Sequence, residues 1–156
     1  MRNVFFPEEQ ITKNDLYFIC YMVERIARRI KQKNAYVVNS IGKDELLRLL
    51  SLASVLHSEN PEKVEDEWIN EYELQKGTFD ITDIDEDLVN EIPTATQMGK
   101  VYMRLILDTL LPEEDYVHAM LRVYNDTICE IIDNYNASAY YEPSYVIARA
   151  YKNGGF

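Results

Sequence analysis

The segment from residue 35 to 57, AYVVNSIGKDELLRLLSLASVLH, constrains the fold of this chain more than any other part. Wound as a helix with about 3.6 residues per turn, its second half is apolar nearly all round, and Arg48 is the only charge between Leu46 and Leu56. One face carries Leu46, Leu49, Leu50, Ala53 and Leu56, and the other side still holds Leu47, Leu52 and Val55. Such a helix is usually buried. We therefore predict that other helices wrap around it.

Hydrophobic residues recur at helical spacing along most of the chain. The pattern predicts long helices over residues 13–32, 44–57, 61–72, 98–111 and 117–135, with short ones at 35–41 and after Ser144. Thr12 with Asp15 resembles a capping box, Asn60-Pro61 is typical of a helix start, and Gly42 should end the short helix. We expect one all-α domain over residues 1–156, a bundle of five or six helices around the leucine-rich helix.

Two segments lack helical periodicity. Residues 1–11 form an N-terminal arm, and we expect Val4, Phe5 and Phe6 to fasten it to the core, because aromatic rings left in water forgo burial. Residues 77–96, GTFDITDIDEDLVNEIPTAT, form an acidic loop. A connection of roughly 20 residues without its own helix is unusually long. The loop is therefore expected to be either functional or mobile.

The net charge of −11 is concentrated in the middle of the chain. Residues 53–96 hold two basic side chains against thirteen acidic ones, whereas residues 1–52 hold nine against six. This balance disfavours general nucleic-acid binding, which needs a basic surface. It is compatible with a basic partner, and the acidic residues proposed for such contacts are Asp83, Asp85, Glu86 and Asp87.

Basic residues crowd the end of the first predicted helix, among them Arg25, Arg28 and Arg29. One interpretation is that they offset the partial negative charge at a helix C-terminus. The other is a docking patch for an acidic partner or for the acidic middle of this same chain.

Twelve tyrosines are many for 156 residues, and five of them lie between Tyr135 and Tyr151. Tyrosine is enriched at protein interfaces because it buries a large ring while its hydroxyl finds a partner. Tyr140, Tyr141 and Tyr145 are thus candidate interaction residues. The alternative is that they pack the tail onto the bundle.

The sequence offers no complete catalytic set. His57 and His118 are the only histidines, and a His118–Cys129 pair on one continuous helix would be separated by ~16 Å along its axis. Cys20 falls on an apolar stripe, and Cys129 is the better candidate for a reactive thiol, although packing is favoured for both. The N-terminus lacks the pattern of a secretory signal, so we expect two free thiols in a reducing cytoplasm.

No metal or cofactor is expected. Two histidines and two cysteines at these spacings match no zinc pattern. Residues 80–91 resemble a calcium loop only at Glu91, because Ile84 takes the fifth position and Asp85 stands where glycine is needed. The chain also has no glycine-rich loop that could hold a phosphate.

Three stretches, FICYMVERIARRI, AYVVNSIG and VLHSENPEKVEDEWI, carry a resemblance to a family of small bacterial domains of unknown function. In that family a helix precedes a short helix, a glycine and a helix ending in a Leu-His pair, here Leu56-His57. The genes of similar members are associated with predicted ADP-ribosyltransferase-like proteins, which implies a toxin-linked or mobile-element role. The resemblance covers residues 16–69 and implies no catalytic residue.

These observations favour a non-enzymatic protein-binding module, of the antitoxin or immunity type in a bacterial toxin-linked locus. The partner would be a protein encoded nearby, with no direct contact to nucleic acid or membrane. One alternative is an acidic nucleic-acid mimic that inhibits a DNA-binding enzyme. Another is an enzyme that uses His57 or Cys129. A homodimer is also expected, because Leu47 and Val55 add more apolar surface to the leucine-rich helix than one short chain can cover.

Overall fold

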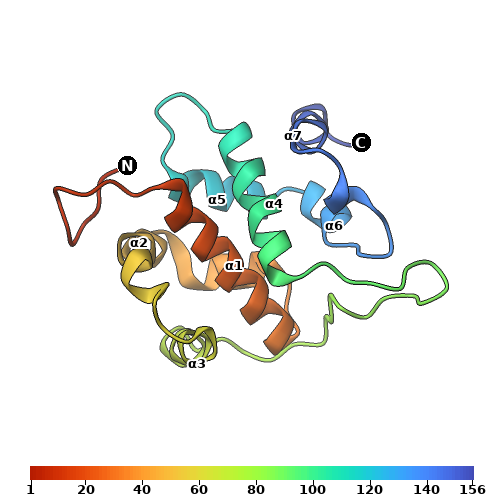
Figure 1. Ribbon diagram of the computed structural model, residues 1–156, viewed down its shortest axis with the longest axis horizontal. Helices are drawn as coiled ribbons and strands as arrows, with labels where there is room; N and C mark the ends of the chain where they lie inside the picture. The colour runs from red at the N-terminus through yellow and green to blue at the C-terminus, as the bar shows by residue number, and fades with distance from the viewer.

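Helix α1 (Lys13–Ile30) lies at the centre of the computed structural model, which describes all 156 residues (Figure 1). It packs most extensively on α4 and then on α2, and ten of its residues are buried. The leucine-rich helix was expected in this place. It lies beside α1 instead, so the prediction of an all-α bundle is confirmed while its central helix differs.

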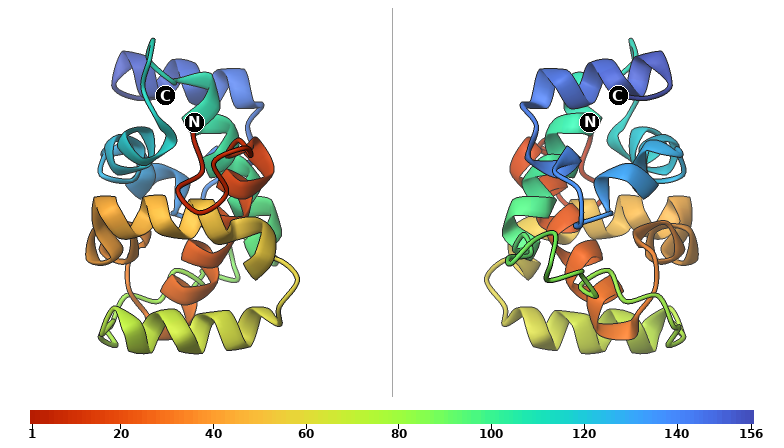
Figure 2. Two further views of the ribbon diagram at one scale, coloured as in Figure 1. Left: turned by 90° about the vertical axis from the view of Figure 1, so that its left-hand side faces the viewer. Right: turned by 90° about the vertical axis from the view of Figure 1, so that its right-hand side faces the viewer.

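The chain forms seven α helices and one short 3₁₀ helix, without a β-sheet, so the bundle has more than the five or six helices expected. In chain order they are α1 (Lys13–Ile30), α2 (Asn34–Leu56), α3 (Pro61–Glu71), α4 (Ala95–Asp108), α5 (Tyr116–Tyr124), α6 (Ile128–Ile132), η1 (Ala139–Tyr141) and α7 (Ser144–Asn153). Figure 2 shows α3 and α7 at opposite ends of the molecule, with α1, α2 and α4 between them. No helix is both long and apolar enough to cross a membrane.

Helix α2 bends at Gly42, as the sequence predicts. Gly42 has φ of 80° and ψ of 170°, a backbone conformation inside the helix that side-chain-bearing residues rarely adopt. Beyond the bend, Leu46, Leu49 and Leu50 face the core. Leu47 is only half-buried and Val55 is 49% exposed. The outer apolar side of this helix is therefore at the surface, which is why the helix is not the centre of the bundle.

The helix predicted over residues 117–135 is in fact two helices. Helix α5 ends at Tyr124, and α6 begins at Ile128 after the polar residues Asn125, Asp126 and Thr127. Asp126 Oδ1 accepts a hydrogen bond from the backbone N–H of Ile128 at 2.9 Å. This local turn competes with continued helix. The apolar spacing of residues 128–135 continues that of α5 and so conceals the break.

The predicted helix caps are largely confirmed. Thr12 and Asp15 form a reciprocal capping box, and Asn60 caps α3 with Pro61 at its first position. Gly154 ends α7 in the left-handed conformation, with φ of 81°. His57 is the C-cap of α2.

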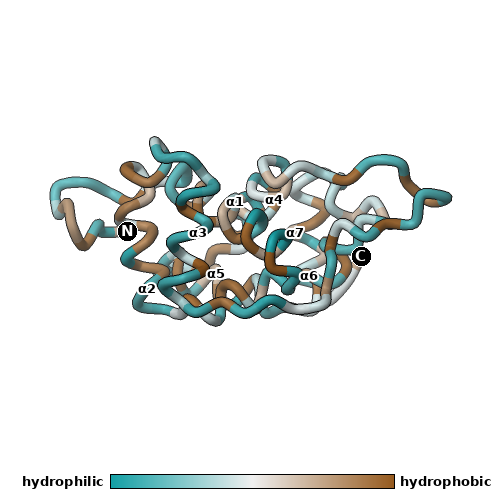
Figure 3. Tube along the Cα trace, turned by 90° about the horizontal axis from the view of Figure 1, so that it is seen from below, coloured by the Kyte–Doolittle hydropathy of each residue, from teal (hydrophilic) through white to brown (hydrophobic).

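Along the helices, hydrophobic and hydrophilic residues alternate in the manner of amphipathic segments (Figure 3).

The N-terminal arm is fastened by Asn3 and not by its aromatic residues. The Asn3 side-chain amide donates to the backbone oxygen of Ser51 at 2.8 Å, and its Oδ1 accepts from the backbone N–H groups of Phe5 and Phe6. This tight turn directs the following residues outward, so that Phe5 is 47% exposed. The expectation for Val4 and Phe5 was therefore wrong.

The acidic loop predicted over residues 77–96 ends at residue 94, because α4 begins at Ala95, and it follows a defined course between α3 and α4 (Figure 1). The Gly77 N–H donates to the Ile30 carbonyl at 2.7 Å, and Ile81 is buried in the core. The Asp85 N–H donates to Asn136 Oδ1 at 2.6 Å. These contacts fix both the start and the middle of the loop, while residues 85–88 are exposed.

Candidate functional site

Glu24 is the centre of a buried polar cluster. Its side chain lies on α1 at 1% exposure, where an unpaired carboxylate would be strongly disfavoured. Arg28, one turn further along α1, approaches Glu24 Oε1 at 3.1 Å, and the Tyr135 hydroxyl donates to the same oxygen. Asn34 Nδ2 donates to Glu24 Oε2 at 2.8 Å. Three donors from different segments thus compensate the burial of one charge.

Asp133 joins this cluster from the end of α6. Its carboxylate accepts from the Tyr102 hydroxyl at 2.6 Å and from Asn34 Nδ2 at 3.3 Å. Burial, and next the nearby Glu24 carboxylate, raise the pKa of Asp133 well above its ordinary value. Asn34 Oδ1 has no hydrogen-bond partner. The cluster connects α1, α2, α4 and α6, which is a structural role.

Arg28 extends the cluster to the acidic loop. Its Nη2 donates to the backbone oxygen of Pro93 at 2.8 Å and approaches the Tyr135 hydroxyl at 3.3 Å. The guanidinium also lies over the Tyr135 ring, 5.6 Å from its centre. One side chain therefore holds the C-terminal end of the loop against α1 and the segment after α6.

Cys129 lies beside this cluster, on α6. A hollow of about 340 Å³ reaches it between the start of α2 and the α5–α6 turn, and Asn34 and Asp133 also line this hollow. The Cys129 thiol is 7% exposed and donates to the Val123 carbonyl at 3.0 Å. Burial, and next the Asp133 charge, raise its pKa. A thiol in this environment stays protonated, which disfavours Cys129 as a nucleophile.

His57, the other residue proposed for an enzymatic role, is exposed at the end of α2. Its ring packs on Phe18, with ring centres 5.1 Å apart. The His118 side chain is 51% exposed, and its Nδ1 lies 2.9 Å from Asp115 Oδ1. No group of three His, Cys, Asp or Glu side chains is placed to hold a metal ion.

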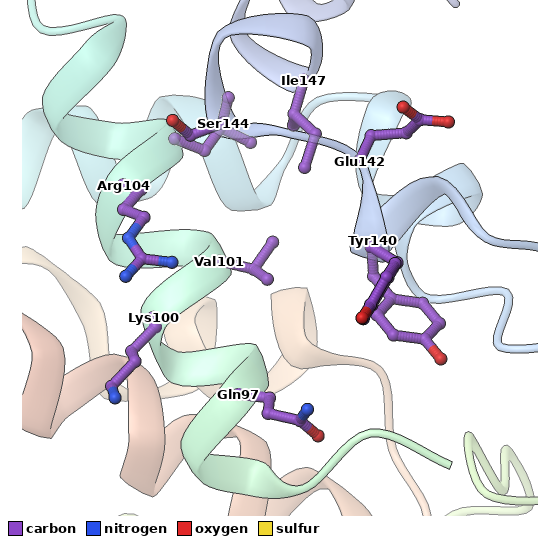
Figure 4. Close-up of a pocket in the computed structure, with 10 residues that line it drawn as sticks. Gln97, Lys100, Val101, Arg104, Tyr140, Glu142, Ser144 and Ile147 are labelled. Atoms are coloured by element: carbon purple, nitrogen blue, oxygen red, sulfur yellow. The ribbon is translucent and has the colours of Figure 1, made fainter. Parts of the chain in front are cut away.

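A groove of about 230 Å³ lies between α4 and the segment from η1 to α7 (Figure 4). Residues that line it are Gln97, Lys100, Val101, Arg104, Leu105, Tyr140, Tyr141, Glu142, Ser144 and Ile147. In Figure 4, Val101 projects from α4 toward the side of Ile147 and Tyr140, while Lys100 and Arg104 extend to the left of α4 and line the α4 edge of the groove. The groove therefore has an apolar floor with a basic margin and an aromatic margin.

The two cations of the groove are free. Lys100 and Arg104 are exposed one helical turn apart, and neither forms an ion pair or a side-chain hydrogen bond within the chain. Tyr141 on the other margin is 78% exposed. Tyr145, at the start of α7, is exposed as well, with Arg149 5.9 Å from the centre of its ring. Exposed tyrosine and arginine side chains are enriched at protein contact surfaces.

The structure brings two of the three predicted tyrosines into this groove. Tyr140 and Tyr141 line it, and Tyr145 is a near neighbour on α7. Sequence reasoning missed Lys100 and Arg104. Their spacing of four residues on a predicted helix was a visible signal, but their proximity to the tyrosines depends on the tertiary fold.

The predicted arginine patch lies elsewhere and is paired within the chain. Arg25 contacts Glu65 at 2.7 Å, and Arg29 contacts Asp66 at 2.5 Å, both on α3. Arg28 pairs with Glu24. Arg25 and Arg29 thus dock the acidic α3 onto α1, whereas Arg28 takes part in the buried cluster.

The predicted acidic residues lie on the exposed part of the loop. Asp83, Asp85, Glu86 and Asp87 are exposed, and none forms an ion pair within the chain. Leu88 follows them and is 67% exposed, although it is a large apolar residue. The loop thus presents carboxylates around an aliphatic side chain.

Comparison with protein-family models, with curated proteins and with solved structures finds no match to this chain. The resemblance of residues 16–69 to the bacterial domain family therefore stays an expectation from the sequence.

Proposed function

We propose that this chain is a protein-binding module whose groove between α4 and α7 accepts an acidic segment of a partner protein. The observation that carries the proposal is the position of Lys100 and Arg104 beside that groove. Both are exposed and unpaired in a chain with a net charge of −11. The many acidic side chains elsewhere on the surface would repel an acidic segment. Attraction by Lys100 and Arg104 therefore determines where the segment docks.

The apolar floor and the tyrosines supply the rest of the contact. Val101 and Ile147 offer an aliphatic surface, and Tyr141 a large ring that loses little conformational freedom on binding. An acidic segment with one apolar residue among its carboxylates fits this combination. No catalytic chemistry is required of the site.

We further propose an antitoxin-like or immunity role in a bacterial toxin-linked locus, with the cytoplasm as its location. The support is the resemblance of residues 16–69, together with Cys20 and Cys129, which are both free thiols. In this setting the partner would be a toxin-like protein encoded nearby.

A pull-down from the native host with the intact chain tests the proposal. The wild type should retain a stoichiometric protein, and a Lys100→Glu/Arg104→Glu variant should lose it, because the reversed charges repel an acidic segment. A Lys43→Glu/Lys76→Glu variant is the matched control, since both lysines are exposed and unpaired away from the groove. Equal recovery of the partner by both double variants would contradict the proposal.

A further inference from the structure

The apex of the acidic loop is an ordered turn that presents Leu88. The backbone N–H groups of Leu88 and Val89 both donate to the Asp85 carbonyl, at 2.9 and 3.0 Å. Asp85 Oδ1 also accepts from the Asp87 N–H at 2.9 Å. These three bonds fix the turn while Leu88 stays 67% exposed. An exposed aliphatic side chain on a fixed turn is suited to insertion into a groove.

Contacts with the rest of the chain hold the loop in place as well. The Asp85 N–H bonds to Asn136 Oδ1 at 2.6 Å, and the Pro93 carbonyl bonds to Arg28 at 2.8 Å. Ile81 is buried. A segment that is already ordered loses little conformational entropy when it binds.

The loop and the groove are complementary in charge and polarity. The loop offers Leu88 beside Glu86 and Asp87, all exposed and with no ion pair in the chain. The groove offers the apolar Val101, Leu105 and Ile147 with two free cations at its margin. Within one molecule the two do not meet, because Leu88 remains exposed and does not line the groove.

We infer that the groove receives the Leu88 turn of a second copy of this chain. This inference rests on the proposed function, because it uses the same groove and the same kind of acidic segment, here supplied by a second copy. Leu88 fills the space over Val101 and Ile147, while Glu86 and Asp87 lie near Lys100 and Arg104. Each molecule both donates a loop and accepts one.

The arrangement of the elements favours a closed dimer. The loop and α7, which forms one wall of the groove, lie toward the same side of the molecule, on the right in Figure 1. A two-fold axis on that side allows both loops to insert at once, so that no groove is left open. Two small contacts of this kind predict a dimer with a dissociation constant in the micromolar range.

Sedimentation velocity of the intact chain, from low micromolar to several hundred micromolar, tests the inference. The wild type should show a concentration-dependent dimer. The Leu88→Ser variant and the Lys100→Glu/Arg104→Glu variant should each weaken it by about tenfold or more. The Lys43→Glu/Lys76→Glu control should dimerise like the wild type. Circular dichroism verifies that each variant keeps its helical content.

Charge exchange makes the test specific. A Glu86→Lys/Asp87→Lys variant should be monomeric, and combining it with Lys100→Glu/Arg104→Glu in one chain should restore the dimer. A wild type that stays monomeric at every concentration overturns the inference. So does a dimer that persists in the groove and loop variants but is lost in Val55→Asp, since it would use the outer face of α2.

The same variants separate this inference from the proposed function. A monomeric wild type that still retains a host protein through Lys100 and Arg104 overturns the self-association alone. A dimer with the expected variant profile, but without any retained host protein, supports the self-association and contradicts binding of a different protein.

Discussion

Glu24 and Asp133 are held together by a single amide group, because Asn34 Nδ2 donates to both carboxylates, at 2.8 and 3.3 Å. The two acidic residues come from α1 and from the end of α6; Glu24 is buried, and Asp133 is half-buried at the edge of a hollow. Two carboxylates this close disfavour simultaneous ionisation. The position of this pair therefore makes the stability of the fold depend on pH.

The Asp133→Asn variant should reveal that dependence. The pKa of Asp133 is raised in the folded chain above its unfolded value of about 3.9. Its protonation therefore stabilises the fold fully below that value, and the contribution is lost as pH rises toward the folded pKa. Asparagine does not ionise, so the Asp133→Asn variant does not lose this stability as pH rises. The free energy of unfolding of the variant, relative to wild type, should increase from pH 4 to pH 8 in urea titrations. If the difference in unfolding free energy between variant and wild type stays constant or falls with pH, the prediction is wrong.

Arg28→Met should be strongly destabilising. The substitution removes the cation beside Glu24, which is 1% exposed, and leaves a buried carboxylate without its charge partner. Breaking such a pair costs about 3–5 kcal/mol. Urea unfolding monitored by circular dichroism measures the loss.

Arg29→Met is the matched control for Arg28→Met. Arg29 and its partner Asp66 are both largely exposed, so their ion pair contributes about 0–1 kcal/mol. Equal losses in the two variants would show that the buried cluster does not stabilise the fold.

Gly42→Ala should destabilise the fold because α2 bends at a φ of 80°. A side chain at this φ and ψ introduces strain of about 1–3 kcal/mol, even though the space around Gly42 is open. Gly155→Ala is the control, since Gly155 has neither a positive φ nor a close neighbour. Thermal unfolding should show a lower midpoint for Gly42→Ala alone. Unchanged midpoints in both variants would mean that the bend adapts to a side chain.

Parts of this fold are readable from the sequence because they depend on a few adjacent residues. The capping box of Thr12 and Asp15 and the bend at Gly42 are of this kind. The break between α5 and α6 is local too, but the apolar spacing continues through it and favours one long helix. The hydrogen bond from the Ile128 N–H to the Asp126 side chain forms a turn that ends α5 and separates it from α6.

The central position of α1 could not be predicted from its periodicity. The buried face of α1 includes Glu24, which in the sequence interrupts the apolar stripe. Its burial becomes favourable only in the fold, where Tyr135, 111 residues away, donates a hydrogen bond to it. The leucine-rich helix has a more apolar sequence, yet it presents Val55 to solvent. Burial depends on which side chains find partners across the fold, and a sequence window does not contain those partners.

The groove was only half predictable for the same reason. The tyrosines between 135 and 151 indicate an interface by composition, and Lys100 with Arg104 mark one face of a helix. Their meeting at one groove requires α7 to pack on α4. No local pattern encodes that contact.

Neither cysteine should react with thiol reagents in the folded protein. Burial raises the pKa of Cys20 to about 12 and also raises that of Cys129. Labelling with a maleimide should therefore be slow in buffer and should reach two thiols per chain in urea. Rapid labelling of Cys129 in the folded state, blocked by Cys129→Ser, would revive its candidacy as a nucleophile.

Substitution of the adjacent Tyr140 and Tyr141 should distinguish a role in packing from a role in binding. Tyr140 is half-buried, with its ring centre 5.6 Å from that of Tyr135, whereas Tyr141 is 78% exposed. Tyr140→Ala should lower the free energy of unfolding by about 1–3 kcal/mol, because it removes an aromatic pair and a half-buried ring. Tyr141→Ala should change it by about 0.5 kcal/mol or less.

The binding measurement completes this comparison. In the pull-down, Tyr141→Ala should reduce partner recovery despite its nearly unchanged stability, because its ring contacts Tyr140 edge-on but is otherwise largely exposed to another molecule. Tyr145→Phe serves as the control, since it keeps an exposed ring next to the groove. If Tyr141→Ala destabilises the fold as much as Tyr140→Ala, the tyrosines of the tail act in packing and not in recognition.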